Sequence, residues 1–126
     1  MIHLIAAVGK SGQIGLDGAL PWRAPEDLKW FKELTMGQTL IAGYRTAQTL
    51  PPLPGRELLV MKRGDTPLPY LVLAKTKNKD LWIIGGAQTY KLWAPYVDRF
   101  HISQIDYDGP ADTYFPDIVP HERKTR

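Results

Sequence analysis

Residues 81–93 read Leu-Trp-Ile-Ile-Gly-Gly-Ala-Gln-Thr-Tyr-Lys-Leu-Trp, and this stretch predicts a buried strand, a tight turn and a short helix in succession. The apolar run ends at two adjacent glycines, and the helix over 87–93 is expected to stop before Pro95. Paired glycines let another molecule approach the backbone closely, and they leave the first N–H groups of the helix open to an anion. The stretch is not the G-x-G-x-x-G fingerprint, so an ordinary dinucleotide-binding Rossmann domain is not supported.

The same order of strand, glycine and helix occurs earlier in the chain. A short strand at 39–42 ends in a glycine, and a helix at 46–50 is broken by two prolines. Between them, residues 43–46 read Gly-Tyr-Arg-Thr and offer backbone N–H groups, a guanidinium and a hydroxyl, which together suit a phosphate. A plain turn is equally compatible with these four residues.

Further apolar runs extend this alternation. Strands are expected at 2–8, 39–42, 58–61, 70–74, 81–84 and 99–105, and helices at 25–35, 46–50 and 87–93. The pattern predicts a largely parallel sheet covered on both faces, in one domain over residues 1–126. Ligands of such sheets bind at the carboxyl ends of the strands, which here are the segments after residues 8, 43 and 84. Residues 9–24, rich in glycine and proline, are expected to form a long functional loop, and the stretch from Asp106 is also expected to be loop.

Composition restricts the class of protein. The 126 residues are 44% apolar and 23% charged, as in a globular domain, and the longest apolar runs are too short to span a bilayer. The absence of cysteine excludes a disulfide framework, a thiol nucleophile and cysteine-based zinc sites, and it fits a cytoplasmic protein. The three histidines show no metal-binding spacing, so no metal site is expected. The formal charge of +3 suits a polyanionic small molecule better than a nucleic acid or a membrane.

Asp27 lies in the first turn of the helix expected at 25–35, where a carboxylate favours the positive end of the helix dipole. On a helix, Asp27, Leu28 and Phe31 project from one face, and the two apolar side chains need burial. Asp27 is therefore expected to be carried toward the apolar side, where a carboxylate must be paired or hydrogen-bonded. There it would suit the amidine-like edge of a flat ring. The alternative is a surface carboxylate that caps the helix.

Two further segments carry candidate ligands for anions. The turn at 53–56, Leu-Pro-Gly-Arg, presents Arg56 beside Leu50, which suits a ligand carboxylate, although a plain surface turn is about as consistent. Lys62 and Arg63 follow the strand at 58–61 and could hold a further phosphate. On local grounds a solvated strand end explains this pair better.

Taken in order, these segments resemble dihydrofolate reductase. The matching pieces are Leu4-Ile5-Ala6-Ala7, Ile14-Gly15, Leu20-Pro21-Trp22, Pro25, Asp27-Leu28, Trp30-Phe31-Lys32, Gly43, Thr46, Leu53-Pro54-Gly55-Arg56, Ile84-Gly85-Gly86, Tyr90 and Asp112-Thr113-Tyr114-Phe115-Pro116. No single piece is decisive, whereas the ordered set is highly specific. The resemblance implies an α/β fold with a mixed, mostly parallel central sheet flanked by helices and shortened at the C-terminus.

The resemblance also implies a reaction, the NADPH-dependent reduction of 7,8-dihydrofolate to 5,6,7,8-tetrahydrofolate by hydride transfer. It makes Asp27 and Trp22 the catalytic residues: Asp27 would bind the pterin and favour protonation of N5, and Trp22 would position a water near that atom. Ser103 falls where the family has a threonine that hydrogen-bonds the acid. Residues 9–24 would be the mobile loop that closes over the nicotinamide.

The resemblance assigns the remaining binding residues to two groups. The substrate-binding residues implied are Ile5, Ala6, Asp27, Leu28, Phe31, Lys32, Leu50, Leu53, Arg56, Ile84, Tyr90 and Ser103. The cofactor-binding residues implied are Ala7, Ile14, Gly15, Leu20, Gly43, Tyr44, Arg45, Thr46, Lys62, Arg63, Gly85, Gly86, Ala87, Gln88 and Thr89.

Three departures from the family pattern generate further expectations. Tyr44 stands where the family usually has arginine, and Arg63 replaces a small hydroxyl residue, so the contacts of the adenosine 2′-phosphate are expected to involve Arg45 and Arg63. The stretch at 70–80 is short, so the helix that the family carries there is expected to be missing. The chain stops near the point where the family continues into a final hairpin, so the strand at 99–105 is expected to be an exposed edge and to favour a homodimer.

Two alternatives to an active dihydrofolate reductase remain open. One is a non-catalytic folate- or nucleotide-binding protein, or a structural protein, derived from the same fold. The other is a reductase of a related pterin or pyrimidine. Retention of Asp27, Trp22 and Arg56 argues against a structural relic, and the pairing of Asp27 with Arg56 argues against the related reductase.

Overall fold

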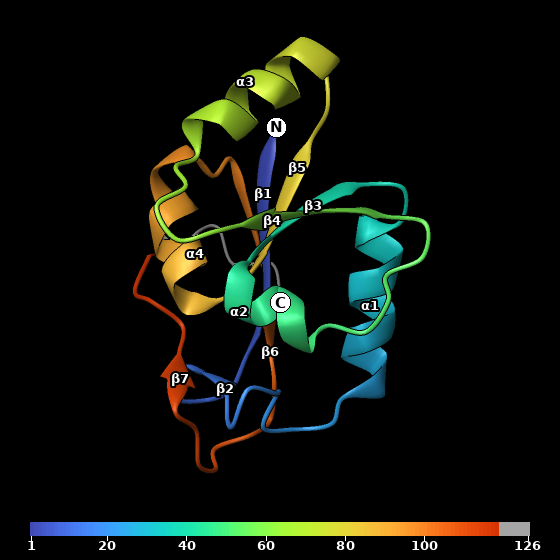
Figure 1. Ribbon diagram of the computed structural model, residues 1–126. Coiled ribbons are helices and arrows are strands. Elements are labelled where there is room, and N and C mark those ends of the chain that lie inside the picture. The colour runs from blue at the N-terminus through green and yellow to red at the C-terminus, as the bar shows by residue number, and fades with distance from the viewer. Residues whose placement is uncertain (119–126) are drawn as a thin grey trace.

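The computed structural model describes residues 1–118, which form a central sheet with helices on both faces (Figure 1). The sheet strands are β1 (Ile2–Val8), β3 (Thr39–Gly43), β4 (Glu57–Met61), β5 (Leu81–Gly85) and β6 (Arg99–Gln104), in the order β4-β3-β5-β1-β6. Every neighbouring pair in this sheet is parallel. The prediction of a mostly parallel sheet flanked by helices is therefore confirmed. No helix in the described residues is long and apolar enough to cross a membrane.

The helices and the short strands lie outside this sheet. The helices are α1 (Pro25–Thr35), α2 (Tyr44–Thr49), α3 (Leu68–Lys77) and α4 (Ala87–Trp93), followed by a 3-10 turn at Ala94–Tyr96. The short strands β2 (Gln13–Gly15) and β7 (Thr113–Tyr114) pair antiparallel with each other. In Figure 1 α1 and α4 lie on opposite sides of the sheet.

Alternation along the strands separates two apolar cores. On β1, Leu4 and Val8 join Trp93 of α4 in the larger core, whereas Ile5 joins Phe31 of α1 in the smaller one. This is the period-2 pattern of a strand whose two faces are both covered. Burying each of these large side chains contributes roughly 1.5–3 kcal/mol, so both faces contribute to holding the sheet between its helices.

Helix α1 has the bounds that the sequence predicts. Pro25 occupies the first turn with two acidic residues, and the N–H of Met36 closes the last turn on the carbonyl of Lys32. Gly37 follows with a φ of +76°, a left-handed conformation that ends the helix at little cost only for glycine.

Helix α3 corrects two expectations. The strand predicted at Tyr70–Ala74 is wrong, because these residues lie inside a helix, and the expectation that this helix is missing is therefore also wrong. Leucine, alanine and lysine favour a helix, and Asn78, with a φ of +53°, ends it in a left-handed cap. The apolar run misled the prediction because apolar residues lie on both the exposed and the buried side of the helix. Leu68 and Val72 are exposed, whereas Ala74 is buried, so no 3.6-residue stripe is visible.

Three smaller expectations are also corrected. The loop at 9–24 contains β2 and a bridge between Leu16 and Ala19, and the loop expected from Asp106 contains β7. Strands of two or three residues are too short to produce a recognisable periodicity. The helix expected at 46–50 begins two residues earlier, directly after Gly43.

Strand β6 is an edge, as expected. Of the strands in the described part of the chain, it pairs with β1 alone, from His3↔Arg99 to Val8↔Gln104. The point where the family continues into a hairpin lies outside residues 1–118.

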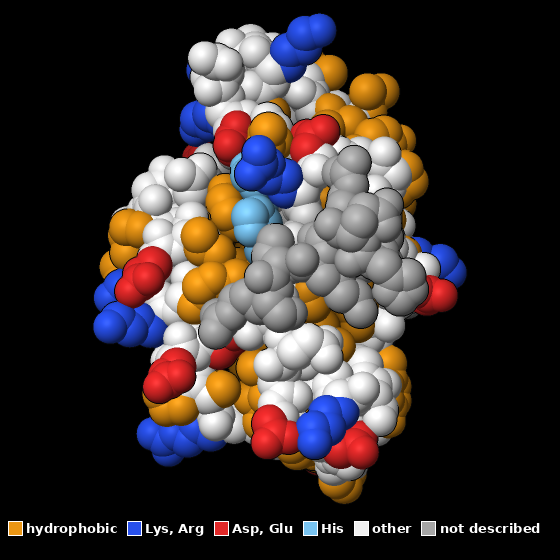
Figure 2. Space-filling view, turned by 180° about the vertical axis from the view of Figure 1, so that it is seen from behind, with side chains coloured by type: hydrophobic (Ala, Val, Ile, Leu, Met, Phe, Trp, Pro, Cys, Tyr) orange, Lys and Arg blue, Asp and Glu red, His pale blue; other side chains and the backbone are white. Residues whose placement is uncertain are grey.

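A hydrogen-bonded chain joins the amino ends of three strands. Asp80 Oδ2 lies 3.0 Å from His3 Nε2, and His3 Nδ1 lies 3.0 Å from His101 Nε2. An ionised carboxylate accepts only, so His3 carries its proton on Nε2 and accepts at Nδ1 the hydrogen bond that His101 donates. Trp82 stacks on both imidazoles, with ring centroids 4.1 and 4.8 Å away. Figure 2, which views the molecule from behind, shows histidine atoms at the surface.

This arrangement opposes protonation of His101. Burial, the adjacent His3 ring and the Arg99 guanidinium lower the pKa of His101 from 6.5 to about 4. Between these two pH values the unfolded chain binds a proton that the folded chain does not bind. The contribution of His101 to stability is therefore complete above pH 6.5 and is lost as the pH drops toward 4.

We predict that His101→Gln, which keeps a donor toward His3 but does not titrate, makes the free energy of unfolding clearly less dependent on pH across this window. The wild-type protein should lose on the order of 2 kcal/mol over the same range. Urea unfolding at a series of pH values measures both slopes. Equal slopes for the two proteins between pH 6.5 and pH 4 would contradict the assignment to His101.

Candidate active site

The carboxyl ends of β3 and β5 form a cradle of glycine backbone. Gly43 ends β3, and Gly85-Gly86 end β5, the strand beside it. A Cβ at Gly43 would come within 2.5 Å of Thr89 Oγ1, and a Cβ at Gly86 within 2.9 Å of Thr46 Oγ1. Only glycine fits at these positions without displacing its neighbours.

The two threonines join the predicted phosphate-type junctions into one feature. Thr46 belongs to α2 but packs against Gly86, whereas Thr89 belongs to α4 but packs against Gly43. Both helices therefore begin beside each other at the same edge of the sheet. A bare backbone with two hydroxyls suits a bridging anion such as a pyrophosphate.

Cationic side chains extend this edge outward. Gly43 at the end of β3 pairs with Met61 at the end of β4. Arg45 after β3 and Lys62 and Arg63 after β4 therefore lie at the same edge of the sheet. All three are exposed. The carboxylate of Asp65 accepts a hydrogen bond from the backbone N–H of Lys62, so the turn after β4 is ordered by its own residues. Tyr44, between Gly43 and Arg45, is exposed.

The smaller core supplies an apolar wall beside the cradle. Ile5, Phe31, Leu53 and Ile84 belong to this one cluster, as expected for residues that would enclose a flat ring. Tyr90 fixes its edge, because its buried hydroxyl donates to the carbonyl of Ile5 at 2.8 Å. Burial raises the pKa of Tyr90 far above its ordinary value, so this donor keeps its proton.

Asp27 lies at the start of α1, beside this wall. The residue as a whole is half-buried, whereas its Oδ1 oxygen is out of contact with solvent. The expectation of a buried carboxylate is therefore confirmed for that oxygen. The expectation that Leu28 is buried is wrong for the chain by itself, because Leu28 is 56% exposed. Only the side chains on the face of α1 that packs on the sheet are covered, and Leu28 lies outside that face.

The orientation of the Arg56 side chain is fixed by contacts that the sequence did not indicate. Its guanidinium lies 3.4 Å from Thr35 Oγ1 and 3.2 Å from the carbonyl oxygen of Pro54, and its centre lies 6.0 Å from the centroid of Phe31. Thr35 is fully buried and also donates to the carbonyl of Phe31. A signal for Thr35 was present: it follows Asp27 and Phe31 at intervals of four, on the same face of α1.

The loop at 9–24 is fastened to the segment at 106–112. Gln13, only 2% exposed, donates from Nε2 to Asp108 Oδ1 at 3.2 Å and to the carbonyl of Gly109 at 3.1 Å. The backbone N–H of Asp17 donates to Asp112 Oδ2 at 2.9 Å. Gln13 was missed because an isolated glutamine in a glycine-rich loop carries no sequence pattern.

The other predicted residues are distributed around this edge. Ala7 and Ser103 are register partners on β1 and β6, and Ser103 is buried. The side chain of Ala6 lies in the larger core, on the face opposite Ile5, so only its backbone is available to a ligand there. The remaining members are Ile14 and Gly15 in β2, Leu20 and Trp22 in the loop, Lys32 on α1, Leu50 after α2, and Ala87 and Gln88 in the first turn of α4.

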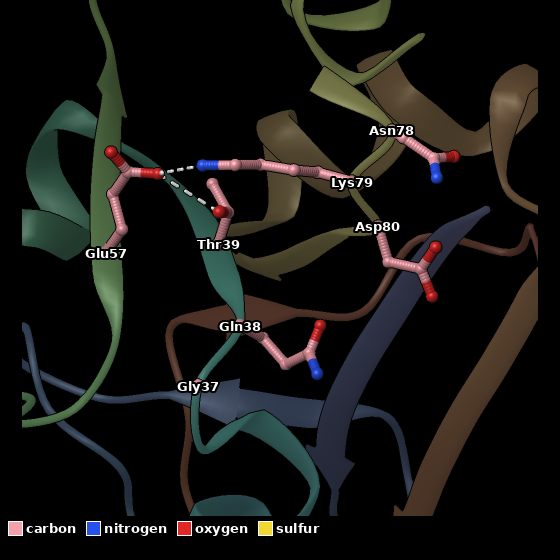
Figure 3. Close-up of a pocket in the computed structure, with 7 residues that line it drawn as sticks. All are labelled: Gly37, Gln38, Thr39, Glu57, Asn78, Lys79 and Asp80. Atoms are coloured by element: carbon pink, nitrogen blue, oxygen red, sulfur yellow. Dashed lines mark hydrogen bonds and ion pairs between the residues drawn. The ribbon is translucent and has the colours of Figure 1, made fainter.

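A hollow of about 470 Å³ lies at the opposite end of the sheet, at the amino ends of β3, β4 and β5 (Figure 3). Its charges are already matched: Lys79 Nζ lies 3.3 Å from Glu57 Oε1, which also accepts the Thr39 hydroxyl. None of the predicted site residues lines it. Within residues 1–118, no group of three or more histidines or carboxylates is arranged to hold a metal ion.

Comparison with known proteins gives a consistent set of relatives. A family model described as dihydrofolate reductase matches residues 1–125. The dihydrofolate reductase of Mycobacterium tuberculosis is 40% identical over 123 residues, which are 89% of this chain and 76% of that protein. A solved structure of the Enterococcus faecalis dihydrofolate reductase, complexed with NADP(H) and RAB-propyl, superimposes with a TM-score of 0.78 and 32% identity, over 94% of this chain and 78% of the other. The dihydromethanopterin reductase of Methylorubrum extorquens is 31% identical, over 90% of this chain and 89% of that protein.

Proposed function

The chain belongs to the dihydrofolate reductase family, and on this premise we propose how its residues divide the work of the reaction. It is an NADPH-dependent oxidoreductase that reduces 7,8-dihydrofolate to 5,6,7,8-tetrahydrofolate. One hydride and one proton enter the substrate for each NADPH oxidised. The observation that carries the proposal is that a carboxylate with a shielded oxygen and a glycine cradle flank one apolar wall at one edge of the sheet.

The cradle is proposed to hold the cofactor. Gly43 and Gly86 leave no room for side chains of their own, and the hydroxyls of Thr46 and Thr89 lie beside them, which suits a pyrophosphate. Arg45 and Arg63 are proposed to contact the adenosine 2′-phosphate, because they leave adjacent strands at the same level. NADPH supplies the hydride when bound, and these residues supply position and charge.

Asp27 is proposed to bind the pterin. A carboxylate accepts two parallel hydrogen bonds from a ring N–H and an adjacent amino group, and the shielded environment of Oδ1 strengthens such bonds. Ile5, Phe31 and Ile84 would pack against the ring. Arg56, held by Thr35 and the carbonyl of Pro54, is proposed to bind the carboxylate of the substrate's glutamate.

Protonation of N5 is proposed to depend on two residues. The negative charge of Asp27 favours the protonated pterin, and Trp22 would position the water that delivers the proton. Ser103, buried and opposite Ala7 on the neighbouring strand, is proposed to orient the Asp27 carboxylate.

A related pterin is the second candidate substrate. The likeness to a dihydromethanopterin reductase favours it, and Asp27 would serve any pterin with the same amidine-like edge. Arg56 separates the two candidates, because its guanidinium suits a substrate that ends in a carboxylate. Arg56→Leu should raise the KM for dihydrofolate strongly, whereas a substrate without that carboxylate would be little affected.

We predict that Asp27→Asn lowers dihydrofolate-dependent NADPH oxidation by at least about a hundredfold near neutral pH, because asparagine keeps the shape but loses the charge. Glu26→Gln, which changes the adjacent exposed carboxylate, should keep wild-type turnover. Initial rates at saturating substrate, followed at 340 nm, measure both. Absence of turnover in folded wild-type protein would overturn the proposed function, and equal rates in both variants would remove Asp27 from it.

We predict that Arg63→Ala weakens NADPH by about tenfold and NADH little, because only the first carries the 2′-phosphate. Lys91→Ala removes one exposed positive charge from α4 and serves as the matched control for net charge. Cofactor affinity is measured by the quenching of tryptophan fluorescence on titration. Equal losses for the two cofactors would show that Arg63 does not contact the 2′-phosphate.

A homodimer through β6 is a further proposal, together with a cytoplasmic location. It is supported by the position of β6, which in residues 1–118 pairs on one side only, since an unpaired strand edge offers N–H and C=O groups to a second chain. Light scattering at micromolar concentration should give twice the mass of the chain. A monomeric mass would rule out this interface.

A further inference from the structure

Tyr107 contacts both ends of the loop at 9–24. Near the start of the loop, the backbone N–H of Lys10 donates to the carbonyl of Tyr107 at 2.8 Å. At the far end, the ring of Trp22 lies against the ring of Tyr107, with centroids 5.5 Å apart and planes inclined by 54°. One residue of the segment at 106–112 therefore spans the loop that the function assigns to closure over the site.

The Tyr107 side chain is itself held firmly. Its hydroxyl donates to the carbonyl of Pro110 at 2.6 Å, and its backbone N–H donates to the carbonyl of Ile105 at 2.8 Å. The ring lies directly on the backbone of Gly109, where a Cβ would come within 2.7 Å of the hydroxyl oxygen. Tyr107 is therefore a fixed surface against which another group can be oriented.

Trp22 needs such a surface. It lies in a stretch without helix or strand, between the exposed residues Leu20 and Arg23, so no regular backbone hydrogen bonds fix its direction. In residues 1–118, its indole makes an aromatic ring contact with Tyr107. A tilted aromatic pair of this kind favours one orientation of the indole by several-fold.

We propose that Tyr107 is a positioning residue, which orients the Trp22 indole and thereby sets the rate of proton delivery to the substrate. This inference rests on the proposed function, in which Trp22 positions the water that protonates N5. Tyr107 itself touches neither substrate nor cofactor in this scheme, and it acts only through the indole.

The other fastenings of the loop make the effect specific. Gln13 remains bonded to Asp108, and the N–H of Asp17 remains bonded to Asp112, when the Tyr107 ring is removed. The loop should then stay in place while the indole loses its fixed orientation. Binding of dihydrofolate and NADPH should change little, whereas the step that needs a correctly placed proton should slow.

The test compares Tyr107→Leu with Tyr107→Phe and Tyr114→Leu. Tyr107→Leu removes the ring and should lower kcat by about five- to tenfold with little change in either KM. The loss should be greater at alkaline than at acid pH, where protons are plentiful. Tyr107→Phe keeps the ring and should restore most of kcat. Tyr114→Leu is the matched control: Tyr114 follows this segment, in β7, and its hydroxyl donates to the carbonyl of Ala111.

A second measurement does not depend on activity. The indole N–H signal of Trp22 in a ¹⁵N correlation spectrum, assigned with Trp22→Phe, should shift and broaden in Tyr107→Leu and stay in place in Tyr114→Leu. Tyr107→Met replaces Tyr107→Leu if the latter does not fold. Wild-type kcat, pH profile and indole signal in Tyr107→Leu would overturn the inference while the wild-type assay still supports the function. Inactive wild-type protein would overturn the function instead.

Discussion

The parallel pairing of β3 with β5 is the constraint on which the site depends. It brings Gly43 and Gly85-Gly86, separated by about forty residues in the chain, to one edge of the sheet, where a Cβ at Gly43 would crowd Thr89 and one at Gly86 would crowd Thr46. Helices α2 and α4 begin there because each strand ends there. β1 lies beside β5, so Ile5 and the start of the loop at 9–24 lie near the same edge. Without this register, the cradle and the apolar wall would not be adjacent.

The two ends of the sheet perform different tasks. At the amino ends, Asp80, His3 and His101 form a chain of hydrogen bonds, and Glu57 is paired with Lys79, so these polar groups satisfy one another. At the carboxyl ends, backbone and cations are left open to a ligand. Tyr90 links the larger core to the candidate site. It is buried in that core, and its hydroxyl donates to the carbonyl of Ile5 at the edge of the site.

Much of this arrangement was predictable from local signals. Pro25 and Gly37 bound α1, and Gly43 and Gly85-Gly86 mark the ends of β3 and β5, because proline and glycine set the backbone geometry whatever surrounds them. Helix α3 was mistaken for a strand because its apolar side chains lie on all sides. Tyr107 was missed for a different reason: its role arises from contacts across the fold, which no local pattern encodes. The spacing of Thr35 from Asp27 and Phe31 places it on their face of α1, but its contact with Arg56 is also made across the fold.

Under the proposed function, this edge holds the nicotinamide of NADPH against the pterin, so that hydride passes directly between them. The most direct test is a single-turnover reaction with NADPH deuterated at C4 of the nicotinamide in the transferred position, with the product analysed by mass spectrometry. We expect the tetrahydrofolate formed to carry one deuterium from the cofactor. Tetrahydrofolate without the label, or oxidation of NADPH without formation of tetrahydrofolate, would contradict it.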